Sequence, residues 1–206
     1  MYTMDAIEFN EKVMKGYFRK IYPVIARQII ERTGITSGHC IDLGGGPGML
    51  GICLAVLSDL KITNYDLMPE CVELVLQNSL DNGVIDRVKA IQGIAEDMKF
   101  DDNSIDLVVS RGSVFFWEDQ KKGLSEVYRV LRPGGWAYIG GGFGSIELLE
   151  EINMQRANDD PEWNQKRKDR IRKNPPEHFQ NIIDELGIDG LVDSSEVGTW
   201  IIFQKL

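Results

Sequence analysis

The sequence predicts an α/β fold in which a mostly parallel β-sheet is covered by helices on both faces. From about residue 38 onward, apolar runs of strand length alternate with segments of helical periodicity. Glycine clusters and prolines separate the two kinds of segment. This alternation requires crossover helices that pack on either face of a parallel sheet. A chain of 206 residues is long enough to bury a core as one domain.

The strands are predicted from short apolar runs that glycine, proline or acidic residues interrupt. Such runs are typical of strands that are buried on both faces of a sheet. We expect strands near residues 38–43, 61–66, 87–92, 105–110 and 135–141, followed by a hairpin of two final strands.

Helical periodicity fills the intervals between these strands. A helix is expected near residues 48–58, and Pro69 is a good first-turn residue for the next helix. The following helix has apolar residues at positions i, i+3, i+4 and i+7, namely Leu124, Val127, Tyr128 and Leu131. The last helix is expected near residues 176–187.

The N-terminal segment lies outside this alternation. Its residues 9–33 predict two helices, because apolar residues from Met14 to Ile21 share one stripe and Pro23 breaks or restarts the helix. We therefore expect residues 1–36 to form a helical segment and residues 37–206 to form the core of the domain.

A charged helical insert is expected at about residues 144–176. Its section 158–176 contains a run of lysines and arginines. A charge run of this kind is typical of a solvated helix. The alternative is a lid over the substrate, with a preference for an anionic group.

The most informative pattern lies at residues 39–51. An apolar strand ends in Asp42, glycines follow, and the apolar residues of a helix come next. This order is typical of a strand, a tight turn and a helix N-terminus. Glycines there let the backbone turn sharply and let a ligand approach main-chain N–H groups. A carboxylate at the strand end repels phosphate and favours a cationic ligand.

Two nucleotide-binding patterns overlap in this loop. The first is Gly46-x-Gly48-x-x-Gly51, which satisfies the dinucleotide fingerprint. Asp66 follows at about 20 residues, where an acid that binds ribose is expected. This pattern favours a nicotinamide-dependent oxidoreductase.

The second pattern is an acidic residue followed by alternating glycines, Asp42-x-Gly44-x-Gly46-x-Gly48. It resembles the first motif of the class I S-adenosylmethionine-dependent methyltransferases. Later segments resemble further motifs of that family in the expected order, at residues 61–68, 92–100, 104–110, 130–135 and 198–205. No Asn/Asp-Pro-Pro-Tyr sequence follows Ser110, so the resemblance is to the small-molecule, biosynthetic C-, N- or O-methyltransferases.

This resemblance implies a Rossmann-like, seven-stranded sheet with an antiparallel last strand and helices on both faces. It implies S-adenosyl-L-methionine as the cofactor and S-adenosyl-L-homocysteine as the product. The N-terminal helical segment is then expected over the cofactor cleft. Asp42 would face the amino-acid moiety of the donor, and Asp66 would accept from both ribose hydroxyls.

Adenine recognition is expected to depart from the family pattern. Ile94 stands where many relatives have an Asp that receives the adenine amino group. The backbone of Ala95 and the side chain of Glu96 would then contact the adenine edge. The cofactor-binding residues that the resemblance implies are Asp42, Gly44, Gly45, Gly46, Asp66, Leu67, Ala95, Glu96, Ser110 and Arg111.

The acceptor side is less specific. Arg111 at a strand end suits a substrate acid, the donor's own carboxylate, a helix-cap partner or a surface salt bridge. The glycines 140–142 permit close approach of a ligand or form a plain turn. We expect the substrate side to include Tyr17, Tyr22, Trp117, Gly142 and Phe143.

The composition limits the classes of binding partner and the cellular compartments that we expect. A formal charge of −9 argues against strong nonspecific binding to nucleic acid. The three cysteines lack metal or redox spacing and suit a reducing cytoplasm. No apolar run approaches the ~20 residues of a membrane span, and residues 1–5 lack the features of a secretory signal. We expect a cytoplasmic protein with a small-molecule acceptor, which the basic insert favours as anionic, and with no membrane or protein partner.

The resemblance implies methyl transfer from S-adenosylmethionine to a small molecule by direct displacement. A sulfonium methyl is already electrophilic, so the protein mainly aligns the nucleophile, carbon and sulfur. We assign no metal and no catalytic residue. The alternatives are the nicotinamide-dependent oxidoreductase and an S-adenosylmethionine-binding module without catalysis.

Overall fold

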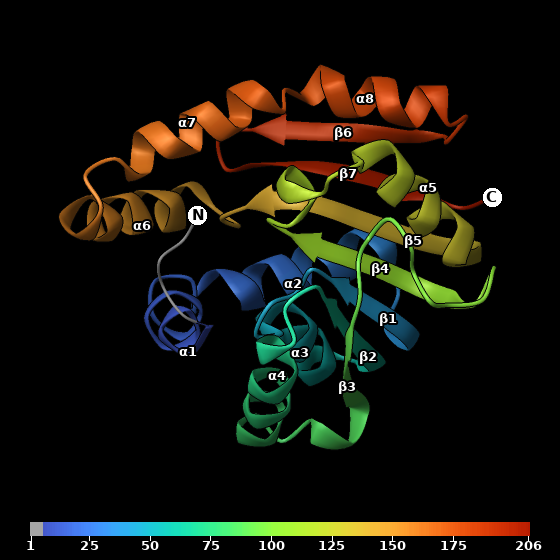
Figure 1. The fold of residues 1–206 in the computed structure, drawn as a ribbon, viewed down its shortest axis with the longest axis horizontal. Helices are drawn as coiled ribbons and strands as arrows, with labels where there is room; N and C mark the ends of the chain where they lie inside the picture. The colour runs from blue at the N-terminus through green and yellow to red at the C-terminus, as the bar shows by residue number, and fades with distance from the viewer. Residues whose placement is uncertain (1–5) are drawn as a thin grey trace.

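The computed structural model describes residues 6–206, so the expectation about a secretory signal concerns residues outside that range. Its centre is one seven-stranded sheet with the strand order β3-β2-β1-β4-β5-β7-β6 (Figure 1). The strands are β1 (Ser37–Leu43), β2 (Asp59–Asp66), β3 (Val88–Gln92), β4 (Ile105–Arg111), β5 (Leu131–Gly142), β6 (Gly190–Ser195) and β7 (Gly198–Gln204).

The strand directions confirm the predicted sheet. Adjacent strands among β1 to β5 pair in parallel, and β7 runs antiparallel to both β5 and β6. The chain order reverses at β1, which lies between β2 and β4. Ligands of open α/β sheets bind beyond the carboxyl ends of the strands at such a reversal.

Helices cover both faces of the sheet (Figure 1). The helical segments are α1 (Ala6–Glu8), the π-helical η1 (Phe9–Tyr17), α2 (Ile21–Thr33), α3 (Met49–Leu57), α4 (Glu70–Asp81), η2 (Ile85–Arg87), η3 (Val114–Phe116), α5 (Gln120–Val130), α6 (Ile146–Asp159), α7 (Trp163–Lys173) and α8 (Pro176–Glu185).

Two hydrophobic cores result from the alternation of side chains along the central strands. In β4, Leu107 and Val109 belong to the core under α2 and α3, whereas Val108 belongs to the core under α5 and α8. Successive strand residues point to opposite faces, so a strand buried on both sides must be apolar throughout. This explains the continuous apolar run that predicted β4.

Two local features differ from the expectation. The N-terminal helices are separated at residues 18–20, and Pro23 lies in the first turn of α2, where its missing N–H is not needed. The Arg132-Pro133-Gly134-Gly135 turn lies inside β5 as an irregularity, because Leu131 pairs with Ile105 and the regular register resumes at Trp136.

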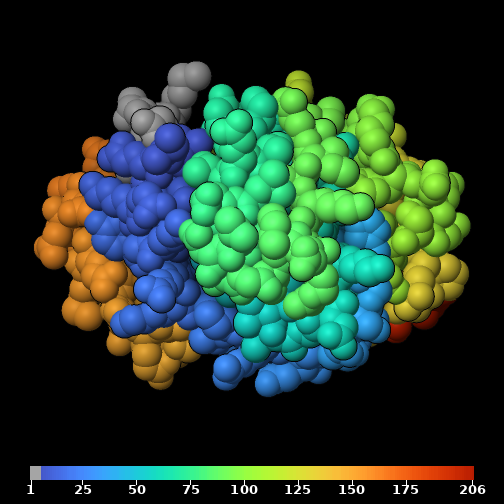
Figure 2. Space-filling model, turned by 90° about the horizontal axis from the view of Figure 1, so that it is seen from below, coloured from blue at the N-terminus to red at the C-terminus, as the bar shows by residue number. Residues whose placement is uncertain are grey.

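The first N-terminal helices, α1 and η1, and the insert lie beyond the carboxyl ends of β4 and β5, whereas α2 packs on a face of the sheet (Figure 1). The insert contains two helices, α6 and α7, which precede α8. On another face, the N-terminal segment lies beside α4 (Figure 2). Among residues 6–206, no helix combines the length and apolarity that spanning a membrane would require.

Candidate active site

The loop between β1 and α3 is built by glycines with different tasks. Gly44, Gly46 and Gly48 have positive φ angles of 64°, 54° and 82°. A Cβ on Gly44 would lie 2.3 Å from the Ser113 Cβ, whereas a Cβ on Gly46 would meet nothing within 4 Å. The Cβ side of Gly44 therefore packs against protein, and that of Gly46 faces open space.

Asp42 is buried at the end of β1 with one of its oxygens unused. Its Oδ2 accepts a hydrogen bond from the Gly51 amide at 2.8 Å, and its Oδ1 has no partner. Burial raises the pKa of Asp42 to about 7; the Gly51 hydrogen bond opposes this shift, and the charge of Asp66 adds to it. A buried acceptor without a partner is costly unless a ligand or water donates to it.

Asn64 adds a second unpartnered oxygen beside the same loop. Its amide nitrogen donates to the Gly46 carbonyl at 3.0 Å, while its Oδ1 is buried without a partner. A Cβ on Gly45 would lie 2.0 Å from that oxygen and 2.6 Å from the Asp42 carboxyl carbon. Glycine at 45 thus lets the loop lie directly over both polar groups.

Asp66 at the end of β2 fixes the loop from the other side. Its Oδ2 accepts from the Gly46 amide at 2.8 Å, and its Oδ1 accepts from the Met68 amide at 2.9 Å. Each carboxylate oxygen has a second lone pair, so both can still accept from a ligand. Leu67, the next residue, is exposed.

The segment after β3 is tied to Asp66 and to the start of α5. The Gly93 amide donates to the Asp66 carbonyl at 2.9 Å. Ala95 is buried and the Ile94 side chain is exposed. Glu96 Oε1 accepts from the amides of Glu118 and Asp119 at 2.8 and 3.2 Å. One oxygen of Glu96 therefore has a structural role.

Ser110 belongs to a hydroxyl network at the end of β4. Its hydroxyl lies 2.6 Å from that of Ser113. Ser113 Oγ donates to the Leu43 carbonyl at 3.0 Å and accepts from Trp117 Nε1 at 3.1 Å. Ser113 thereby joins the ends of β1 and β4.

Arg111 is partly buried among aromatic rings and the Gly142 carbonyl. Its Nε donates to the Gly142 carbonyl at 3.0 Å, and its guanidinium carbon lies 4.6, 5.3 and 5.8 Å from the ring centres of Phe18, Tyr22 and Phe143. No carboxylate of residues 6–206 lies within ion-pair distance of it. The expected surface salt bridge or helix-cap contact is absent from this part of the chain.

Burial lowers the pKa of Arg111, and the positive charge of Arg170 adds to this, while Tyr22 opposes it. Burial also raises the pKa of Tyr22 to about 12, with Arg111 opposing and Asp42 adding to the shift. The Tyr22 hydroxyl donates to Met14 Sδ at 2.9 Å. The Tyr22 hydroxyl is therefore close enough to both Asp42 and Arg111 for each charge to affect its pKa.

The glycines at the end of β5 make room for β7. A Cβ on Gly140 would lie 2.0 Å from the Thr199 carbonyl oxygen, and a Cβ on Gly142 would lie 3.0 Å from the Trp200 ring. Strand packing therefore explains why both positions are glycine, and the predicted contact of this run with a ligand stays a prediction.

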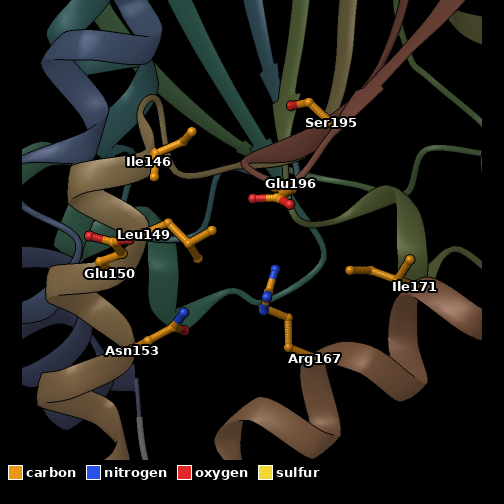
Figure 3. A pocket seen from close by; sticks show the side chains of 8 residues that line it. All are labelled: Ile146, Leu149, Glu150, Asn153, Arg167, Ile171, Ser195 and Glu196. Carbon is orange, nitrogen blue, oxygen red and sulfur yellow. The ribbon is translucent and has the colours of Figure 1, made fainter.

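The predicted substrate-side residues do not all lie together. Tyr22, Gly142 and Phe143 meet at Arg111. The Tyr17 ring contacts Arg156 of α6 instead, 5.1 Å from its guanidinium carbon. Trp117 instead lines a separate hollow of about 590 Å³ with residues of α5 and α8. A further cavity of about 440 Å³ lies between α6, α7 and the turn from β6 to β7 (Figure 3).

Comparison with known proteins identifies the family. The sequence model of the methyltransferase domain matches residues 41–139. A solved structure from Methanococcus maripaludis, described as a candidate S-adenosyl-L-methionine-dependent methyltransferase, is 41% identical with a TM-score of 0.92. The alignment covers 100% of this chain and 97% of that one. The chain belongs to the S-adenosylmethionine-dependent methyltransferases.

Curated relatives of this methyltransferase share its core and are longer. The demethylmenaquinone methyltransferase of Chlorobaculum tepidum is 33% identical over 124 residues, which are 60% of this chain and 48% of that protein. The 2-methyl-6-phytyl-1,4-hydroquinone methyltransferase 1 of rice is 38% identical over 101 residues, which are 48% of this chain and 29% of that protein. The chain thus spans about half the length of the Chlorobaculum protein.

S-adenosylmethionine is the family's cofactor, and the donor side of this methyltransferase fits it. The unpartnered oxygens of Asp42 and Asn64 suit a cationic ammonium group, and Asp66 can accept from hydroxyls. The open side of Gly46 leaves room for close approach of a ligand to the backbone.

Sequence reasoning missed two polar residues of the candidate site, Asn64 and Ser113. Asn64 pairs with Asp42 in the parallel register of β1 and β2, so its position two residues before Asp66 was a usable signal. Ser113 gave no such signal, because its contacts with Gly44 and Leu43 depend on how β4 meets β1.

Proposed function

We propose that this methyltransferase transfers the methyl group of S-adenosylmethionine to a small-molecule acceptor and releases S-adenosylhomocysteine. The observation that carries the proposal is the glycine loop with the unpartnered oxygens of Asp42 and Asn64 beside it. A nicotinamide dinucleotide would bring its pyrophosphate to this loop, where a buried carboxylate repels it. The sulfonium of the bound donor supplies an electrophilic methyl group, so the chain's task is alignment.

The donor contacts follow from the groups that remain free. Asp42 and Asn64 receive the ammonium end, and Asp66 accepts from the ribose hydroxyls while it fixes Gly46. The backbone of Ala95 and the second oxygen of Glu96 face the adenine. Further contacts come from Gly44, Gly45, Leu67 and Ser110.

The N-terminal segment, residues 1–36, is proposed to cover the donor cleft. Its Asn10 accepts from Asn78 Nδ2 at 3.0 Å, and the same nitrogen lies 2.9 Å from the Pro47 carbonyl of the glycine loop. Tyr22 of α2 is close enough to Asp42 for their charges to interact. The core comprises residues 37–206, with the charged insert at about 144–176.

Hydroquinone rings are the first acceptors to test. Both curated relatives described above are named as methyltransferases of quinone-type molecules. A ring carbon next to a phenolic hydroxyl is a nucleophile that needs alignment more than activation by a metal. We infer a reaction in the cytoplasm, because buried free thiols such as Cys40 and Cys71 suit a reducing compartment.

Two measurements test the proposal. Calorimetric titration should show binding of S-adenosylhomocysteine and none of NAD at the same concentrations; the reverse result would establish the oxidoreductase alternative. A panel of hydroquinones and aromatic acids is then assayed for release of S-adenosylhomocysteine. If S-adenosylhomocysteine binds but no acceptor is methylated, the protein is better described as an S-adenosylmethionine-binding module without catalysis.

A further inference from the structure

The cations of helix α7 differ in how they are paired. Arg172 lies 3.1 Å from Asp169, and Lys166 lies 3.2 Å from both Asp160 and Glu162. Arg167 and Arg170 have no ion pair with any of residues 6–206. They are three residues apart, so their side chains are neighbours on the surface of the helix.

Arg167 projects from α7 into the 440 Å³ cavity (Figure 3). Its Nε is buried without a hydrogen-bond partner, and its guanidinium carbon lies 5.9 Å from the ring centre of Phe143. Glu150 and Glu196 also line the cavity, and neither is within ion-pair distance of Arg167. A buried guanidinium nitrogen without an acceptor is costly.

Arg170 contacts a different aromatic ring from those around Arg111. Its guanidinium carbon is 5.0 Å from the ring centre of Phe116, next to the end of β4. Its charge acts on Arg111, which lies on the Phe143 ring that Arg167 also approaches. The three guanidinium groups are therefore linked through Phe143 and through their charges, and none of them has an ion pair with residues 6–206.

We propose that Arg167 and Arg170, together with Arg111, bind one carboxylate or phosphate group of the acceptor. Guanidinium groups match the oxygens of such groups with paired, charge-assisted hydrogen bonds. A bound oxyanion would supply the acceptor that Arg167 Nε lacks and the countercharge that Arg111 lacks. This inference rests on the proposed function, since it assigns a property of the methyl acceptor.

The rest of the acceptor is apolar and carries no second anionic group. Ile146 and Leu149 of α6 and Ile171 of α7 are the apolar residues of the cavity lining. Glu150, next to Leu149, and Glu196, near Arg167, also line the cavity and would repel a second anion (Figure 3). The acceptor is thus a small molecule with one oxyanion group beside an apolar body. Arg111 lies within the matched residues 41–139, whereas α7 lies outside them, so the insert contributes two of the three proposed arginines.

The test compares three probes that differ in charge: benzoate, phenyl phosphate and the neutral benzamide. Each is titrated into the full chain by ligand-observed NMR, with and without S-adenosylhomocysteine. The double variant Arg167→Met/Arg170→Met removes the proposed contacts, and Arg172→Met removes a paired arginine of the same helix as the matched control. Melting temperatures report whether each variant folds, and Arg170→Met alone replaces the double variant if that one does not.

We expect at least one anionic probe to bind about tenfold tighter than benzamide, the effect of one charge-assisted hydrogen bond. The double variant should lose this preference and Arg172→Met should keep it. The relative affinities of benzoate and phenyl phosphate show whether the site prefers a carboxylate or a phosphate. Equal binding of all three probes, or equal loss in Arg172→Met, would overturn the inference. Failure of S-adenosylhomocysteine to bind would instead overturn the proposed function. In that case the titrations of the three probes without S-adenosylhomocysteine still show whether the protein prefers an anion.

Discussion

The proposed donor side and the proposed acceptor side of this methyltransferase are built in opposite ways. The donor side consists of one loop, residues 42–51, with Asp66 at the end of the neighbouring strand. Its buried charges are carboxylates, and its geometry comes from glycine backbone. The acceptor side takes Phe18 from the N-terminal segment, Arg111 from β4 and Arg167 from α7. Its charges are guanidinium groups held on aromatic rings.

This difference indicates which interactions each side needs before a ligand binds. The donor loop is held by hydrogen bonds within residues 42–51, such as the one from the Gly51 amide to Asp42 Oδ2 at 2.8 Å. The acceptor side depends on contacts between elements far apart in sequence, such as Arg111 Nε to the Gly142 carbonyl. Tyr22 lies between the two sides and interacts electrostatically with both Asp42 and Arg111. Changes in the loop should therefore affect the donor alone, and changes around Arg111 the acceptor.

The largest effect is expected from Gly44→Ala. The added Cβ would overlap the Ser113 side chain at 2.3 Å, and a positive φ costs a non-glycine residue about 1–2 kcal/mol in addition. Binding of S-adenosylhomocysteine should become undetectable by calorimetry, with near-native circular dichroism. Gly46→Ala is the control, since it shares the positive φ but meets open space. If both variants bind equally, backbone conformation rather than packing on Ser113 controls the loop.

The second-largest loss of donor affinity is expected from removal of Asp66, the acid at the end of β2. Asp66→Ala deletes the acceptor of the Gly46 and Met68 amides and the proposed acceptor of two ribose hydroxyls. Hydrogen bonds to a charged group contribute about 1.5–3 kcal/mol each, so affinity for S-adenosylhomocysteine should fall at least tenfold. Asp66→Asn, which retains one acceptor oxygen, should lose less. Unchanged affinity in Asp66→Ala would show that the ribose lies elsewhere.

Asp42 predicts a pH dependence of stability with a definite sign. Because its pKa is about 7 in the folded state and near 4 when unfolded, the folded protein holds the extra proton between these values. Stability of the ligand-free protein should therefore fall as pH rises from about 4 to 7, by at most about 1.4 kcal/mol per pH unit. Asp42→Asn should remove this slope in urea unfolding. An identical slope in the variant would assign the pH dependence to other groups.

The sequence predicted the donor side better than the acceptor side for a physical reason. Asp42 and Asp66 end apolar strands, and the parallel register alone brings strand ends to one edge. Arg111 also ends a strand, but its partners come from η1, α2 and β5, which no local pattern brings together. The sequence of glycines 140–142 favoured a ligand-binding segment, because the sequence alone cannot show that β7 fills the space beside Gly140.

A smaller effect on the donor is expected from Arg111→Met. Its guanidinium has no carboxylate partner among residues 6–206, so an apolar side chain of similar length avoids burying an uncompensated charge. The free energy of unfolding should change by about 1 kcal/mol or less, and binding of S-adenosylhomocysteine should remain within threefold, about 0.7 kcal/mol. The preference for anionic probes should weaken. Collapse of donor binding instead would assign Arg111 to the donor's own carboxylate.

The smallest effect is expected from Ile94→Asp, which restores the acid common in relatives at the predicted adenine position. The Ile94 side chain is 43% exposed, so removing it takes little buried apolar area from the core. A carboxylate there could accept from the adenine amino group in addition to the backbone contact proposed for Ala95. Calorimetry should show equal affinity for S-adenosylhomocysteine or a gain of a few-fold, with Ile94→Ala as the control for lost packing. A matching loss in both variants would show that the isoleucine side chain packs on the adenine ring, and the donor side would then share the acceptor side's dependence on packing.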